Sequence, residues 1–125
     1  MNVVDSSAWL EFLADGPNSS FFSATVQDVK HLLVPSITIL EVYKRVCQQR
    51  DASDALAAIA IMRQGRIIDL SIDLALSAAA LGIKYKLPLA DSIILATAEA
   101  NKATVWTMDS DFAEIPGVQY RARKN

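Results

Sequence analysis

The chain has 125 residues, 52% of them hydrophobic and 21% charged, with a formal net charge of -2. This length fits one compact domain and not two, and the composition excludes a disordered chain. A lone cysteine, Cys47, excludes an internal disulfide and a cysteine-based metal site, while the absence of a basic leader or a long apolar run leads us to expect a cytoplasmic protein.

The chain begins with a short apolar stretch, Met1 to Val4, that ends at the carboxylate of Asp5. A stretch without charge is typical of a strand buried on both faces of a parallel sheet. In open α/β sheets the ligand site lies at the carboxyl ends of the strands, so Asp5 is predicted to lie at such an edge. Its alternative role is to cap the next helix, a role that we assign to Ser7.

Helices and strands are expected to alternate along the rest of the chain. The helices are predicted over about 8–14, 21–29, 37–49, 54–63, 72–85 and 90–101, and the later strands over about 31–34, 66–70, 103–107 and 118–120. This alternation predicts a single α/β domain over residues 1–125, with a parallel sheet flanked by helices on both faces. Residues 121–125 form a basic tail that we expect to be loose.

Several acidic residues stand where a strand passes into a helix or in the first turns of a helix. They are Asp5, Glu41, Asp91 and the pair Asp109 and Asp111. The strand ends meet at one edge of a parallel sheet, so these carboxylates are predicted to face one shallow pocket.

Clustered carboxylates raise one another's pKa, and a divalent cation removes that cost. A set of oxygen ligands without histidine or cysteine favours Mg²⁺ or Mn²⁺ over Zn²⁺. Such an ion lowers the pKa of a bound water and stabilises the charge of a phosphoryl displacement. The hydroxyls of Ser6, Ser7 and Thr107 are expected to orient the carboxylates or to bind a phosphate.

Each acid also has an ordinary interpretation. Asp91 and Asp109 stand where helix caps are common, and Asp111 fits a cap of the turn that carries Phe112. Glu41 has the spacing for a surface ion pair with Arg45. Only the combination of the acids favours a metal site.

The residues that carry this pattern resemble a known family. The order is Val3-Val4-Asp5-Ser6-Ser7-Ala8-Trp9, then Ser36 followed at five residues by Glu41, then Leu89-Ala90-Asp91-Ser92, then Thr107-x-Asp109-x-Asp111-Phe112. Over residues 1 to about 120, the chain resembles PIN-domain proteins and, within them, the small ribonuclease toxins of VapBC toxin–antitoxin systems.

The resemblance implies a sheet of about five strands in the order 3-2-1-4-5 and metal-dependent cleavage of RNA phosphodiester bonds by water. It also implies a homodimer, a cognate antitoxin, and a hetero-oligomer formed with it. Asp5, Glu41, Asp91 and Asp109 match the family's catalytic acids, Asp5, Asp91 and Asp109 being the main metal ligands, with Asp111 an extra acid found in some members. Antitoxins of such systems typically place a basic side chain in the acidic pocket.

Two other groups of residues bear on partners. Arg121, Arg123 and Lys124 are candidates for contacts with RNA phosphates, although most of the chain's basic residues fit solvated helix faces. The aromatic residues Trp9, Phe12, Phe21 and Phe22 belong either to the core or to an exposed groove for an amphipathic antitoxin helix.

Other functions are weighed by residue spacing. A phosphatase of the haloacid dehalogenase type needs a second aspartate two residues after the first, where this chain has Ser7, and a response-regulator receiver needs an acidic pair near its start. The alternatives that stay open are a PIN nuclease of RNA processing and a PIN-like module that binds RNA or protein without cleaving it.

Overall fold

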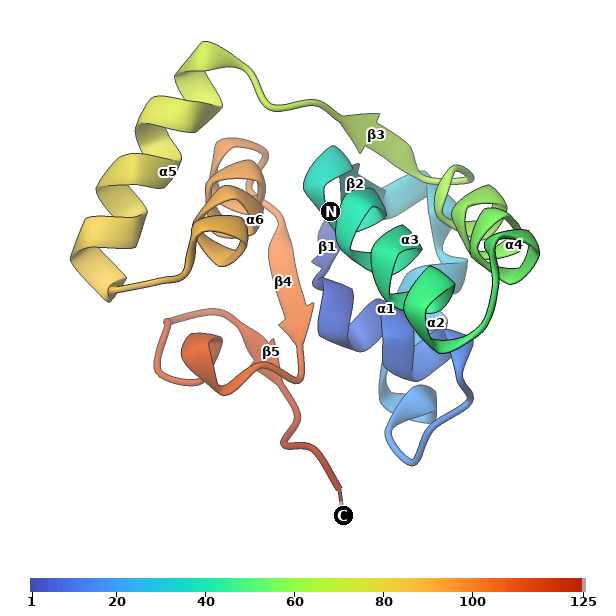
Figure 1. Ribbon diagram of the computed structural model, residues 1–125. Helices are drawn as coiled ribbons and strands as arrows, with labels where there is room; N and C mark the ends of the chain where they lie inside the picture. Colours follow the sequence, from blue (N-terminus) through green and yellow to red (C-terminus); the bar gives the residue numbers. More distant parts are fainter. Residues whose placement is uncertain (125) are drawn as a thin grey trace.

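The computed structural model describes residues 1–124 as a five-stranded sheet flanked by helices (Figure 1). The strands are β1 (Asn2–Val4), β2 (Leu32–Pro35), β3 (Arg66–Ile68), β4 (Thr104–Thr107) and β5 (Gln119–Tyr120). All pairs are parallel and the order is β3-β2-β1-β4-β5. The predicted strand order and the central place of the first strand are therefore confirmed. Asn125, the last residue of the predicted tail, lies outside the described residues.

Within these described residues, six α-helices and two short 3₁₀ helices connect the strands. They are α1 (Ser6–Leu13), α2 (Ser19–Gln27), η1 (Val29–His31), α3 (Ser36–Gln49), α4 (Ala52–Met62), α5 (Ile72–Tyr85), α6 (Leu89–Ala100) and η2 (Ser110–Phe112). The predicted helices are all present, with ends that differ by a few residues. His31 was predicted in a strand but belongs to η1, and α1 begins at Ser6, so the prediction that Ser7 caps this helix was wrong.

The central strand divides the core in two, because successive side chains of a strand point to opposite faces. Val3 packs with Ile94 and Leu95 of α6, whereas Val4 packs with Trp9 of α1 and Phe22 of α2. Both valines are fully buried. This confirms that the apolar stretch at the start of the chain is buried on both faces.

The helices lie in two layers. α1, α2, α4 and most of α3 cover one face of the sheet, and α6 covers the other with α5 outside it (Figure 1). The direction of the strand order reverses between β1 and β4, where Val4 pairs with Trp106. Such a switch point, at the carboxyl ends of the strands, is where open α/β sheets bind ligands. Within residues 1–124, no helix is long and apolar enough to cross a bilayer.

Candidate active site

Asp5 lies at the switch point, directly after β1, and its side chain is 2% exposed. It precedes α1 in extended backbone, but its carboxylate makes no capping bond to that helix. Instead, its Oδ2 accepts hydrogen bonds from the Ser7 hydroxyl at 2.7 Å and the Thr107 hydroxyl at 2.8 Å. The ordinary role of a helix cap therefore does not explain this aspartate.

The two hydroxyls are themselves held by the backbone that follows β4. Ser7 Oγ accepts from the Met108 N–H at 3.0 Å, and Thr107 Oγ1 accepts from the Asp109 N–H at 2.9 Å. Each hydroxyl thus has one lone pair occupied and directs its proton to Asp5. This network fixes the end of β1 against the end of β4 and orients the buried carboxylate.

Glu41 extends into the same region from the second turn of α3. Its Oε1 accepts a hydrogen bond from the Ser6 hydroxyl at 2.6 Å. The surface ion pair with Arg45 that its spacing suggested is not formed, since no ion pair joins the two side chains within residues 1–124. Ser6 thus orients Glu41 in the way that Ser7 orients Asp5.

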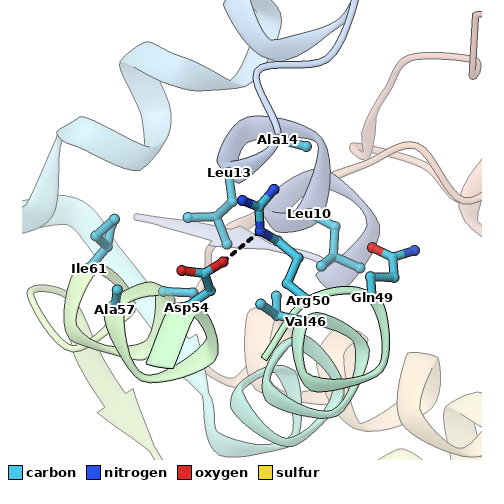
Figure 2. Close-up of a pocket in the computed structure, with 10 residues that line it drawn as sticks. Leu10, Leu13, Ala14, Val46, Gln49, Arg50, Asp54, Ala57 and Ile61 are labelled. Carbon is cyan, nitrogen blue, oxygen red and sulfur yellow. Dashed lines mark hydrogen bonds and ion pairs between the residues drawn. The ribbon is translucent and has the colours of Figure 1, made fainter. Parts of the chain in front are cut away.

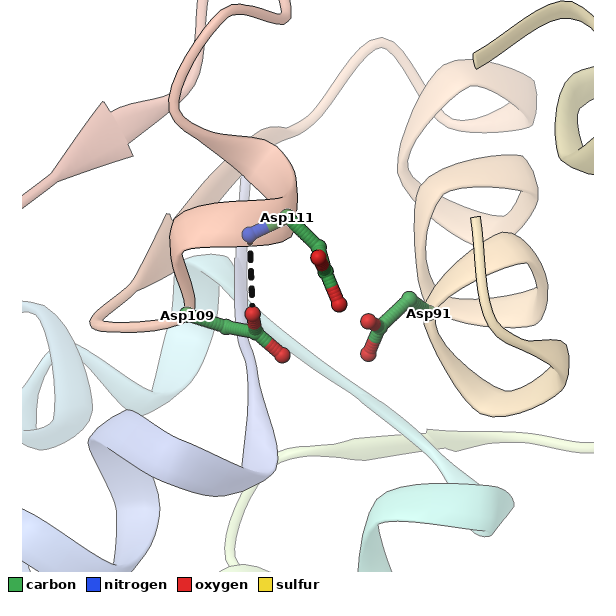
Figure 3. A group of neighbouring side chains, drawn as sticks. All are labelled: Asp91, Asp109 and Asp111. Atoms are coloured by element: carbon green, nitrogen blue, oxygen red, sulfur yellow. Dashed lines mark hydrogen bonds between the residues drawn. The ribbon is translucent and has the colours of Figure 1, made fainter. Parts of the chain in front are cut away.

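Three further carboxylates converge on one another (Figure 3). Asp91 projects from the first turn of α6, while Asp109 and Asp111 come from the start of η2. Each offers an oxygen within 4.8 Å of the others. Asp109 also accepts a hydrogen bond from the Asp111 N–H at 2.9 Å and therefore caps η2. The ordinary interpretation had assigned this cap to Asp111.

The electrostatics of the cluster are unfavourable without a cation. Burial, followed by the charges of Asp5 and Asp109, raises the pKa of Asp91 from 3.8 to about 8. Burial also raises the pKa of Asp5, although the bonds from Ser7 and Thr107 oppose this. Such crowded acids are expected where a divalent ion binds, and the all-oxygen donor set fits one.

Four of the five predicted acids, namely Asp5, Glu41, Asp91 and Asp109, line one open pocket of about 240 Å³, whereas Asp111 does not line it. Its lining residues are Asp5, Ser6, Ser7, Leu10, Glu41, Arg45, Asp91, Asp109 and Arg123. Of the predicted basic residues, Arg123 lines this pocket, whereas Arg121 and Lys124 do not. Arg45 was missed as a site residue, although its spacing of four residues from Glu41 places it on the same face of α3.

The C-terminal segment, expected to be loose, makes specific contacts as far as Ala122. The Arg121 N–H donates to the Thr107 carbonyl at 3.0 Å and extends the pairing of β5, while the Arg121 guanidinium lies 4.2 Å from the centre of the Phe21 ring. The Asn18 amide donates to the Ala122 carbonyl at 2.9 Å. These contacts hold the tail against the start of α2, and Arg123, the next residue after Ala122, lines the acidic pocket.

A second and larger pocket, about 560 Å³, lies between α1 and the α3–α4 pair (Figure 2). Its lining is largely apolar and consists of Leu10, Leu13, Ala14, Val46, Gln49, Arg50, Asp54, Ala57, Ala58 and Ile61. The four aromatic residues that were candidates for an antitoxin groove do not line this pocket. Trp9 and Phe22 are fully buried in the core, and Phe12 and Phe21 are partly buried against it. Leu10 lines both pockets, so the groove meets the acidic pocket there.

Comparisons with known proteins agree with this geometry. The family model of the PIN domain matches residues 3–118, and the chain belongs to that family. No sequence among the curated proteins matches the chain.

Several solved structures share the fold. One chain of a toxin–antitoxin complex from Klebsiella pneumoniae is 28% identical, with a TM-score of 0.76 and coverage of 94% of this chain and 95% of that one. VapC20 from Mycobacterium tuberculosis is 16% identical, with a TM-score of 0.80 and coverage of 95% and 98%. FitAcB from Neisseria gonorrhoeae is 20% identical, with a TM-score of 0.74 and coverage of 96% of both chains.

Proposed function

We propose that this PIN domain is a divalent-metal-dependent endoribonuclease that acts as the toxin of a type II toxin–antitoxin system. The observation that carries the proposal is the convergence of Asp91, Asp109 and Asp111 within 4.8 Å of one another, beside the buried Asp5. Such crowding destabilises a protein unless a cation binds there. VapC20, which shares the fold, is described as a toxin that cleaves the sarcin–ricin loop.

Asp5, Asp91, Asp109 and Asp111 would hold the cation, with Glu41 at the edge of the same pocket. Mg²⁺ or Mn²⁺ suits ligands that are all oxygen. When bound, such an ion supplies an activated water and stabilises negative charge on the oxygens of a phosphodiester.

The chain's own residues determine the orientation of these ligands. Ser7 and Thr107 fix Asp5, Ser6 fixes Glu41, and the Asp111 N–H fixes Asp109. Hydrogen bonds of this kind hold metal ligands in place. Removing one typically lowers metal affinity by a factor of about 10 to about 100. Ser6, Ser7 and Thr107 are therefore positioning residues in this proposal.

The proposed partner is a cognate antitoxin that occupies the groove between α1 and the α3–α4 pair. Its apolar lining suits an amphipathic segment, and its junction with the acidic pocket at Leu10 would let one occupant cover both. A structure from Klebsiella pneumoniae with this fold is described as a toxin–antitoxin complex, and one from Salmonella typhimurium is described as DNA-bound VapBC. An RNA substrate and a single free thiol, Cys47, both suit the cytoplasm.

The second candidate function is that of a PIN nuclease of RNA processing. A small neighbouring reading frame with a DNA-binding start and a disordered end would favour the toxin, and neutralisation by that frame's product on co-expression would establish it. The orientation of Asp5 and Glu41 by hydroxyls favours both nucleases over a module that only binds RNA.

The test is cleavage of single-stranded RNA in Mg²⁺ or Mn²⁺, together with growth after induction. We expect Asp91→Asn and Asp5→Ala to abolish cleavage and growth arrest. Asp73→Asn is the matched control, because Asp73 is an exposed aspartate in the first turn of α5 and lies outside the pocket. Full activity of Asp91→Asn, or equal loss in the control, would refute the proposed site.

A further inference from the structure

We propose that Arg45 and Arg123 bind phosphates of the RNA strand beside the acidic pocket, and that Asn18 and Phe21 position Arg123 for this task. The inference rests on the proposed ribonuclease function, whose acidic residues share the pocket with both arginines. Arg45 comes from α3 and Arg123 from the tail after β5, so the two lie far apart in the sequence.

Neither arginine is neutralised by the acids around it. Within residues 1–124 the ion pairs are His31 with Asp28 and Arg50 with Asp54, and both lie away from the acidic pocket. Glu41, the acid with the right spacing for Arg45, instead accepts the Ser6 hydroxyl at 2.6 Å. Both guanidinium groups are therefore available to an anion, and both are exposed.

The contacts of the tail fix the position from which Arg123 reaches the pocket. The Arg121 guanidinium lies 4.2 Å from the Phe21 ring centre, and the Asn18 amide donates to the Ala122 carbonyl at 2.9 Å. Asn18 is 2% exposed, stands at the cap position of α2 and makes no side-chain cap bond there. Its amide holds the tail instead, one residue before Arg123.

A charge balance explains why an acidic pocket needs these arginines. The ionised side chains of Asp5, Glu41, Asp91, Asp109 and Asp111 carry five negative charges, and one divalent cation leaves three of them uncompensated. A phosphodiester would then meet net negative charge. Two guanidinium groups reduce that excess to one charge, and their planar donors match phosphate oxygens in pairs.

The experiment measures binding of a short labelled single-stranded RNA in Ca²⁺ and cleavage kinetics in Mg²⁺. We expect R45Q and R123Q each to weaken binding and raise KM about tenfold, with a smaller change in kcat. Each should also reduce the slope of log affinity against log salt by about 0.7, the value for one phosphate contact on a single strand. Mn²⁺ affinity, measured by calorimetry, should not fall, because neither arginine is a metal ligand and the loss of a positive charge does not disfavour a cation.

Lys44→Gln is the matched control, since Lys44 adjoins Arg45 on α3, is exposed and does not line the pocket. It should leave binding, KM and the salt slope unchanged. Phe21→Leu keeps apolar bulk but removes the ring beneath Arg121, so it should reproduce part of the R123Q defect and add little to it in the double variant. Melting curves establish that each variant is folded.

The outcomes separate this inference from the proposed function. Normal binding, KM and salt slope in R45Q and R123Q overturn the arginine site even if the wild type cleaves RNA. Arginine-dependent RNA binding without any cleavage by the wild type refutes the ribonuclease and supports the arginine site. A normal Phe21→Leu variant overturns the positioning role of Phe21.

Discussion

At the scale of single residues, Asp91 makes the stability of the metal-free protein depend on pH. Its pKa is about 8 in the folded protein and 3.8 without burial and neighbouring charges, so the folded state binds the proton more tightly than the unfolded state. Stability should therefore fall as pH rises from about 4 to about 8 and level off above that. Asp91→Asn should raise the melting temperature at neutral pH by several degrees, at about 4 °C for each kcal/mol.

The pH profile and the response to metal distinguish this effect from a general stabilisation. Near pH 4, where the wild-type carboxyl is protonated, the two melting temperatures should converge. Saturating Mg²⁺ or Mn²⁺ should stabilise the wild type, by about 2.7 kcal/mol at a hundred times the dissociation constant, and should stabilise Asp91→Asn much less. An equal metal response in both proteins would contradict the role of Asp91 as a ligand.

Thr107 provides a second test at this scale, because it is fully buried and donates to Asp5. Thr107→Val removes the hydroxyl while keeping the shape, so the buried carboxylate loses a partner and the free energy of unfolding should fall by about 1–3 kcal/mol. The same change at Thr97 is the control, because Thr97 is 1% exposed and its hydroxyl, within residues 1–124, bonds only to the Ile93 carbonyl of its own helix. Urea unfolding should show the larger loss for Thr107→Val.

At the scale of single elements, one residue at the end of α5 has an unfavourable backbone conformation that a substitution can relieve. Lys86 stands at the helix C-cap in the left-handed region, with φ of 56°, and its N–H donates to the Gly82 carbonyl. Glycine adopts this conformation without steric cost, so Lys86→Gly should stabilise the protein by about 0.5–1 kcal/mol. Lys84→Gly, inside the same helix, should destabilise it by a similar amount, and thermal melts can compare the two.

The elements themselves were largely predictable from the sequence. The apolar run before Asp5 and the alternation of strands and helices predicted a parallel sheet, and the family resemblance supplied the strand order. In a parallel sheet, the place of Asp5 and Asp109 after their strands is enough to bring them to one edge. Helix ends were less predictable, since Asp5 stands at the N-cap position of α1 but its side chain makes no capping bond there.

The contacts that orient the site could not be predicted, because they join residues far apart in the chain. The Ser6–Glu41 bond spans 35 residues, and the Asn18–Ala122 bond that anchors the tail spans 104. A local pattern favoured an ion pair of Glu41 with Arg45 and a loose tail. In the folded protein, the Ser6 hydroxyl binds Glu41 in place of Arg45, and the buried Asn18 amide holds the tail.

At the scale of the whole molecule, one apolar surface is not covered by the chain itself. α5 packs on α6 through Ala78 and Leu81 and lies at the outer edge of the molecule (Figure 1). Its outer stripe holds Ile72, Leu76 and Ile83, which are 80%, 67% and 81% exposed and recur at helical spacing. Leu89, at the start of α6, is 80% exposed as well.

A symmetric dimer would bury this stripe against its copy, since a two-fold axis brings the same surface of each chain together. We expect the wild type to sediment as a dimer, and Leu76→Asp and Ile83→Asp to sediment as folded monomers, because each places a charge at the centre of the contact. Leu56→Asp is the matched control: Leu56 is 61% exposed but lies on α4, in the opposite layer of helices, and its substitution should leave the dimer intact. A monomeric wild type, or dimers that survive both α5 substitutions, would exclude this surface as the interface.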